Sequence, residues 1–165
     1  MLIMSITFDK EHHMDAWRKR LKFMEVKLMG KLIDPVKETY LDAIENVIKN
    51  TPATSGETKA GWAKPLEVEG RSLAAVITPE VNILSKKDVA PKESAIDKGL
   101  KLSIYRKELE PTYINLETIN AAPGAISTEY GDSRTPPTAA VRQAAMTLVE
   151  DLKEVVGTTL KEVSK

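Results

Sequence analysis

The two histidines of the chain, His12 and His13, are the side chains best suited to metal binding or general base catalysis. They are adjacent, so on a helix their side chains diverge by about 100°, whereas two helical ligands of one metal lie three or four residues apart. We therefore expect an exposed pair that binds no metal. A serine nucleophile would need one of these histidines or a lysine as its base, and the sequence has no nucleophile elbow and no glycine-rich phosphate loop.

Other kinds of chemistry also lack support in the residue types. The chain has no cysteine, which excludes disulfides, thiolate metal sites and a cysteine nucleophile. Carboxylates are numerous because charged residues make up 29% of the sequence, but no pair of them stands out for acid–base catalysis. The sequence therefore predicts a protein that is not an enzyme and that needs no cofactor.

Length and charge narrow the class of protein further. With 165 residues, of which 42% are hydrophobic, the chain can form a single domain, residues 1–165, with a real core. Lysine plus arginine and aspartate plus glutamate both number 24, so the formal charge is zero, which disfavours direct sequence-specific nucleic-acid binding. No stretch reaches the ~20 apolar residues of a membrane span, and the N-terminus lacks a signal-peptide pattern. We expect a soluble protein made in the cytoplasm, without a membrane partner.

Two helices are predicted before residue 51. Residues 9–29 repeat apolar side chains at the three-and-four spacing of one helical face, with Trp17 as an expected core anchor. Asp34 and Pro35 have the order of a helix N-cap and first helical residue, so a second helix is predicted from there to Asn50.

The middle of the chain has shorter elements. Thr54 and Glu57 have the spacing of a capping box, which predicts a short helix that carries Trp62 towards the core. Residues 66–78 read as two strands around a Glu-Gly-Arg turn.

A long exposed loop or arm is predicted at 79–98, where charge, proline and serine are mixed without a period. We expect this arm to order when it meets a partner. The residues assigned to it are Lys86, Lys87, Asp88, Lys92 and Glu93.

A second hairpin and a last helix complete the predicted fold. Residues 100–105 and 112–119 alternate apolar and polar side chains, with a turn near Glu110 and Pro111. The last helix is predicted to begin at Thr135-Pro136-Pro137, with Gly157 ending or bending it. Together the elements predict an α+β fold, in which a small antiparallel β-sheet packs against long N- and C-terminal α-helices.

Three segments in a fixed order carry a resemblance to a known family. "NTPATSGETKAGW", then "YINLETINAAPGAISTEYG", then "SRTPPTAAVRQAAM" resemble the head-tail joining, or tail-completion, proteins of tailed bacteriophages, which lie in the neck between capsid and tail. The family's Pro-x-x-Thr/Ser-Gly-x-x-x-x-x-Trp segment is matched from Pro52 to Trp62. The chain departs from the family at Pro123-Gly124-Ala125, where Pro-Tyr-Ala is usual, and at residues 79–104, which look like an insertion.

The resemblance implies a structural protein of the virion neck, present in the host cytoplasm during assembly. It implies a homo-oligomeric ring, hexameric to match tail symmetry, that completes or terminates the tail, and its partners would be further copies of itself, the tail tube protein and head connector or adaptor proteins. We predict that a corner before the last helix meets a neighbouring subunit, because Gly131 permits a sharp turn and the prolines stiffen the entry to the helix. The residues of this predicted interface are Glu129, Tyr130, Gly131, Arg134, Pro136 and Pro137.

Other interpretations of the same sequence remain open. The chain could be a cytoplasmic adaptor that binds a peptide or partner along an exposed sheet edge, or a small hydrolase with an unrecognised site. At the predicted corner, Tyr130 could instead pack under the turn, with the prolines only starting a helix.

Overall fold

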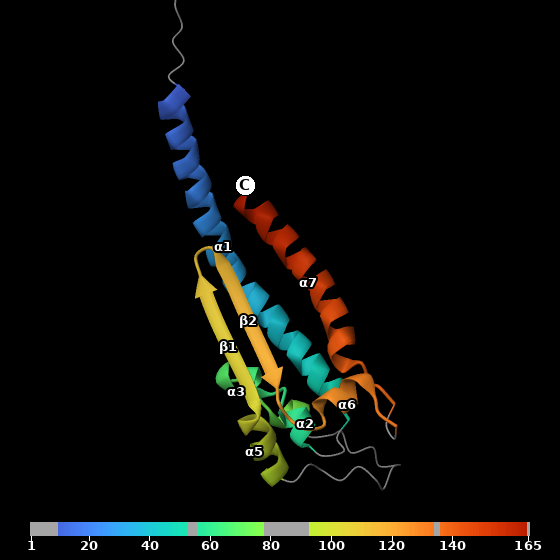
Figure 1. Cartoon of the computed structure of the whole chain (residues 1–165). Coiled ribbons are helices and arrows are strands. Elements are labelled where there is room, and N and C mark those ends of the chain that lie inside the picture. The colour runs from blue at the N-terminus through green and yellow to red at the C-terminus, as the bar shows by residue number, and fades with distance from the viewer. Residues whose placement is uncertain (1–9, 53–55, 78–92, 134–135, 165) are drawn as a thin grey trace, which may run out of the picture.

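The computed structural model describes residues 10–52, 56–77, 93–133 and 136–164, and Figure 1 shows two long helices with a hairpin beside them. The fold class is α+β, as the sequence predicts. The elements in chain order are α1 (Lys10–Asn50), α2 (Glu57–Ala60), α3 (Lys64–Val68), α4 (Ala74–Ile77), α5 (Glu93–Lys101), β1 (Ser103–Glu110), β2 (Tyr113–Asn120), α6 (Ala125–Tyr130) and α7 (Ala140–Val163).

Helix α1 is a single helix of 41 residues, so the prediction of two helices separated before Pro35 is wrong. Proline removes one backbone donor from a helix interior, a cost that tertiary packing can offset. Here buried side chains lie on both sides of the proline, at Leu32 and Leu41, and the Thr39 hydroxyl donates to the Pro35 carbonyl at 2.8 Å. The proline signal is local, whereas the packing that overrides it comes from other parts of the chain.

Helix α7 packs against α1 in the opposite direction (Figure 1). Ala140 and Ala144 contact Val47 near the start of α7, and Lys31 pairs with Glu162 at 3.7 Å near its end. The helix begins three residues after Pro137 rather than at the prolines, and the glycine at 157 does not end it.

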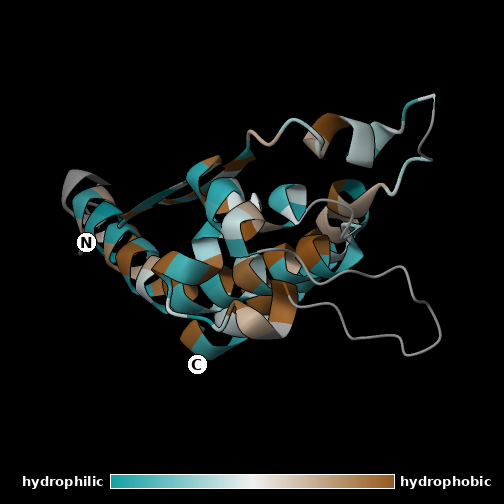
Figure 2. Cartoon of the chain, turned by 90° about the horizontal axis from the view of Figure 1, so that it is seen from below, coloured by the Kyte–Doolittle hydropathy of each residue, from teal (hydrophilic) through white to brown (hydrophobic). Residues whose placement is uncertain are grey.

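The main core lies between α1 and the short helices. Figure 2 shows that each long helix has both hydrophilic and hydrophobic faces, and the hydrophobic face of the second half of α1 covers this core. Trp62 packs partly buried against it, as expected. Thr54 of the predicted capping box lies outside the described residues, and α2 has Gly56 as its N-cap, with φ of 66°. The buried cluster consists of Leu41, Ile44, Ile48, Ala60, Ala63, Leu66, Val76 and Ile77.

The predicted hairpin at 66–78 is wrong, because residues 66–77 form the end of α3, a turn and α4, and Thr78 lies outside the described residues. Pro65 lies in the first turn of α3, a position that proline favours. Leu73, Val76 and Ile77 have three-and-one spacing, which places them on one side of a helical turn facing the core. Gly70, with φ of 73°, makes the turn between the two helices.

The second hairpin is confirmed as an antiparallel pair, with Ser103 opposite Asn120 and Glu110 opposite Tyr113. Its first strand begins three residues later than predicted, because residue 100 belongs to α5. Helix α5 also corrects the predicted loop at its C-terminal end, since residues 93–98 are helical. The rest of that loop, 79–92, lies outside the described residues.

Tyrosine contacts and the half-buried carboxylate of Glu69 hold the hairpin against α1. Tyr40 of α1 stacks on Tyr105 with ring centroids 6.4 Å apart, and its hydroxyl lies 2.5 Å from that of Thr118. Burial, with the nearby Glu69 carboxylate, raises the pKa of Tyr105 to about 12. The Lys107 ammonium donates to Glu69 at 2.6 Å and lowers the pKa of that carboxyl group. The sheet therefore has one face covered by the long N-terminal helix.

Candidate assembly surfaces

The corner between α6 and α7 is built around Glu129. This side chain is buried, with 8% of the residue exposed, and its carboxylate accepts the backbone N–H groups of Val141 at 2.9 Å and Arg142 at 3.2 Å. Those N–H groups belong to the first turn of α7, whose own N-cap residue, Ala139, supplies no side-chain cap. Glu129 therefore caps α7 from the preceding helix, and its negative charge also suits the positive end of the helix dipole.

Arg142 connects this buried cap to the surface. Its Nε donates to a Glu129 carboxylate oxygen at 3.1 Å, and its guanidinium lies 5.3 Å from the centroid of the Tyr130 ring. The tyrosine is 66% exposed, so it lies on the surface against the arginine rather than under the turn. The arrangement fixes one face of the ring and leaves the rest available to another molecule.

The structure thus separates the residues of the predicted interface. Gly131 makes the expected turn, with φ of 78°, and Pro136 and Pro137 lie exposed on the connection to α7. Arg134 lies outside the described residues. Glu129 faces inward and serves its own chain, so among the described residues of the set Tyr130 and the two prolines are the most exposed to a neighbour.

The segments that carry the family resemblance pack on one another. The Asn120 side chain donates to the Thr58 carbonyl at 2.8 Å and accepts the Ala122 N–H at 2.9 Å, which ties the end of β2 to α2. Gly61 lies so close to the Asn120 side chain that a Cβ there would collide with it. A Cβ on Gly124 would likewise come within 2.7 Å of the Thr58 hydroxyl oxygen. Close packing between α2 and the end of β2 therefore explains why glycine stands at positions 61 and 124 and asparagine at position 120.

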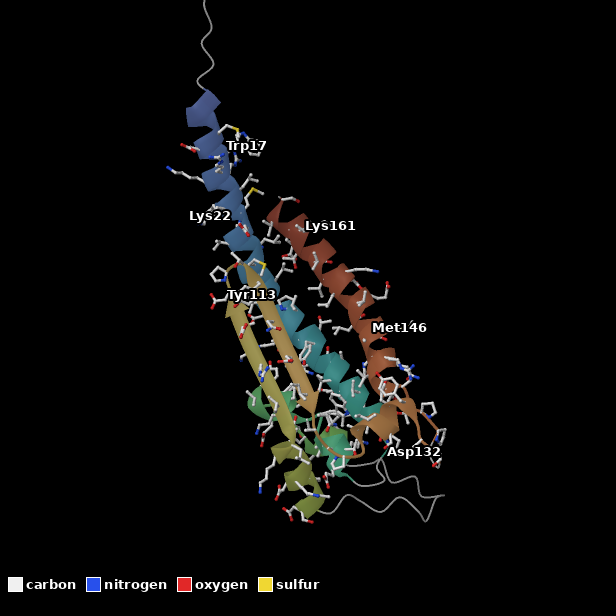
Figure 3. The ribbon with its side chains drawn as sticks, viewed as in Figure 1. Trp17, Lys22, Tyr113, Asp132, Met146 and Lys161 are labelled. Carbon is white, nitrogen blue, oxygen red and sulfur yellow. The ribbon has the colours of Figure 1, made fainter. Side chains whose placement is uncertain are left out.

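The first half of α1 is the second exposed feature. Every residue from Met14 to Lys27 is exposed, and Figure 3 shows Trp17 on the part of α1 that extends past the end of α7 near Lys161. Trp17 is 65% exposed, so the prediction that it anchors the core is wrong. Its periodicity is that of a buried face, but the described part of the chain places nothing against it. We call residues 14–27 the projecting half of α1.

The projecting half combines an apolar stripe with positive charge. Its stripe follows three-and-four spacing through Met14, Trp17, Leu21 and Met24. Its charged residues are five basic ones, Arg18, Lys19, Arg20, Lys22 and Lys27, and two acidic ones, Asp15 and Glu25. Contiguous exposed apolar surface of this kind is typical of an interaction site.

A groove of about 480 Å³ lies between α1 and α7, just beyond the projecting half. Its α1 wall has Lys31 and Pro35, and its α7 wall is mainly acidic and threonine-rich around an apolar patch at Val155. Lys31 already pairs with Glu162. The residues of the α7 wall are Asp151, Glu154, Val155, Thr158, Thr159 and Glu162.

The remaining predicted features add no reactive centre to the described residues. Within them, no group of three or more histidine, cysteine or acidic side chains is placed to hold a metal ion. No helix in the described ranges is long and apolar enough to span a membrane. His12 and His13 lie in the first turns of α1. Of the predicted arm, Glu93 is the exposed first residue of α5, and the others, Lys86, Lys87, Asp88 and Lys92, fall outside the described residues.

Comparison with known proteins returned no matching family model, no matching curated protein and no matching solved structure. The surfaces that the fold leaves exposed are therefore the guide to the function of this chain.

Proposed function

We propose that this chain is a structural subunit of the neck of a tailed bacteriophage, where a ring of copies completes or terminates the tail and joins it to the head connector. The observation that carries the proposal is the projecting half of α1, an apolar and basic helical face with no partner in the described part of its own chain. Burying such a face between chains stabilises an assembly by the same hydrophobic effect that stabilises a core.

The order of the resembling segments gives independent support. Gly61 of the first segment packs against Asn120 of the second, and the Glu129 carboxylate of the second accepts the Val141 N–H of the third, so the three segments form one structural unit instead of scattered matches. A ring of six, matching tail symmetry, requires heterologous contacts, in which two different surfaces of the subunit meet. The exposed corner, the projecting half and the groove between α1 and α7 are candidate surfaces for such contacts.

The direct test is an in vitro joining assay. Particles that lack this protein would be prepared as separate heads and tails, and the purified chain would be added to them. We expect joined virions in electron micrographs, and rings on the ends of free tails. Tails that neither bind the chain nor join to heads in its presence would contradict the proposal.

Tyr130 provides a residue-level test of the corner. The Tyr130 ring is exposed and contacts Arg142 only on one side. Tyr130→Ala should therefore change the free energy of unfolding by less than about 0.5 kcal/mol and leave the melting temperature almost unchanged. The variant should nevertheless form fewer rings, as measured by light scattering and negative-stain microscopy. A variant that keeps both its melting temperature and its rings would exclude Tyr130 from the interface.

The adaptor hypothesis also has a specific observation in its favour. In the described residues the sheet has only two strands, so each strand has one side without a neighbouring strand. Strand β1 carries Arg106, Lys107, Glu108 and Glu110, however, and charged side chains on an edge are a common protection against strand addition. Isothermal titration calorimetry with extended peptides would distinguish the adaptor hypothesis from the neck proposal, because only the adaptor hypothesis predicts saturable peptide binding by a monomer or dimer.

A further inference from the structure

We propose that the projecting half of α1 from one copy of this chain docks into the groove between α1 and α7 of a neighbouring copy. The inference rests on the proposed function as a ring subunit and specifies which two surfaces meet. It is carried by the continuity of α1, the complementary charge of the two surfaces and their matching lengths.

Continuity of α1 excludes docking within one chain. The helix runs without a break from Lys10 to Asn50, and Lys31 and Pro35 of the same helix form one wall of the groove. Residues 14–27 therefore point away from their own groove and cannot fold back into it without breaking the helix. Among the described residues, the projecting half therefore cannot fill its own groove, whereas the projecting half of a second copy can reach it.

Charge selects the groove as the partner of the projecting half. Five basic and two acidic residues lie between Met14 and Lys27, so two projecting halves side by side would place like charges together. The groove offers the opposite sign, because Asp151 and Glu154 are both exposed on its α7 wall. Pairing the helix with the groove therefore brings opposite charges together, whereas pairing it with itself opposes association.

The dimensions of the two surfaces also agree. At about 1.5 Å of rise per residue, residues 14–27 span roughly 20 Å, and the α7 wall from Asp151 to Glu162 spans roughly 16 Å. A groove of about 480 Å³ falls within the range of about 300–1,000 Å³ that accommodates large side chains or ligands. Trp17 and Leu21 are the large apolar side chains of the stripe, and Pro35 and Val155 supply apolar contacts in the groove.

The contact that results is heterologous, because the donor surface and the acceptor surface are different parts of the chain. Each subunit gives its helix to one neighbour and receives a helix from the other, an arrangement that forms a closed ring when the rotation between neighbours closes.

A charge-reversal and rescue experiment tests the docking with the full chain. Light scattering across a concentration series would give the concentration of half-assembly for the wild type, Arg20→Glu, Glu154→Lys and the double variant. Each single reversal should raise that concentration about tenfold or more, and the double variant should restore it, because it recreates an opposite-charge pair. Glu150→Lys, on α7 but outside the groove, is the matched control and should assemble as the wild type does.

The outcomes separate this inference from the proposed function. If the wild type forms rings that neither single reversal weakens, the docking is wrong while the ring function stands. If the wild type stays monomeric at every concentration and on tails, both are wrong. Binding of the monomer to phosphatidylcholine–phosphatidylserine vesicles that is lost in Arg20→Glu and not restored by Glu154→Lys would assign the basic helix to a membrane surface instead and overturn the docking.

Discussion

The two halves of α1 have the same kind of sequence and opposite surroundings. From Lys31 to Asn50, which we call the anchored half, the apolar residues are buried or half-buried against α7, the short helices and the hairpin, and Ile48 is completely buried. From Met14 to Lys27 an equally periodic stripe is exposed. The charged residues of the two halves also differ. Glu38, Asp42 and Glu45 of the anchored half are acidic and all pair with Arg71, whereas most charged residues of the projecting half are basic. Amphipathic spacing therefore predicts that a helical face is covered, but not whether its own chain or another molecule covers it.

The largest expected difference between the halves is in the cost of truncation. Ile48→Ala should lower the free energy of unfolding by about 2–5 kcal/mol, because it leaves a cavity in a packed core. Leu21→Ala in the projecting half, where the side chain is exposed, should cost the isolated chain less than about 0.5 kcal/mol. Urea unfolding at low protein concentration measures both, and a large destabilisation by Leu21→Ala in the monomer would show that the projecting half packs within its own chain.

The cap on α7 should give the next largest effect, since α7 is the wall against which the anchored half packs. Glu129→Ala leaves the N–H groups of Val141 and Arg142 without their acceptor and removes the partner of the Arg142 guanidinium. We expect a loss of about 2 kcal/mol in unfolding free energy. Glu129→Gln keeps one acceptor oxygen and should recover part of that loss. Equal stability of the alanine variant and the wild type would contradict the capping role.

Substitution of Arg71 tests whether ion pairs stabilise the anchored half of α1. Its guanidinium lies 2.5 Å from Glu38, 2.7 Å from Asp42 and 2.8 Å from Glu45, and it holds three α1 carboxylates that would otherwise repel one another. Arg71→Gln should cost about 1 kcal/mol, an effect that high salt should reduce. Arg20→Gln, on the projecting half, is the matched control and should leave monomer stability unchanged in thermal melts. A smaller effect at position 71 than at position 20 would contradict the account.

The smallest expected effect is a dependence of stability on pH through Glu69. The ammonium groups of Lys107 and of Lys37 in α1 lower the pKa of this carboxyl group below its ordinary value of 4.5. A lowered pKa in the folded state adds stability above the ordinary pKa, and that stability is lost as the pH falls through the folded pKa. The melting temperature of Glu69→Gln should therefore lie below that of the wild type at pH 7, and the gap should close in acid. A gap that is constant with pH would exclude this linkage.

Local patterns predicted the elements whose partners are close in sequence. The hairpin of β1 and β2 follows from alternation on both sides of a short turn, and the amphipathic faces of α1 and α7 follow from helical spacing. The break expected at Pro35 was wrong because packing on both sides of the proline outweighs one lost hydrogen bond. The strands expected at 66–78 were wrong because apolar residues near a glycine turn suit two short helices equally well when a core is available.

The candidate surfaces were predictable only in part. Tyr130 was singled out from its place in a Glu-Tyr-Gly corner and is exposed there, but the inward role of Glu129 depends on a helix that starts eleven residues later. The sequence carried no signal for this role, because the helix was expected to start at the prolines, and its N-cap, Ala139, which supplies no side-chain cap, is known only from the structure. The exposure of Trp17 could not be predicted, since its spacing is the same as that of a core residue. The groove combines residues of α1 and α7 that lie more than a hundred positions apart in sequence.

If the projecting half of α1 is an interface between chains, a charged residue in its apolar stripe should block assembly. The molar mass of the wild type and of Trp17→Asp would be determined by light scattering across the same concentration series, with circular dichroism melts of both. The account predicts a multimeric wild type, and a variant whose assembly requires at least about thirtyfold more protein while its monomer melts at an unchanged temperature. Identical mass curves for the two proteins, or a variant that assembles normally but melts early, would contradict the claim.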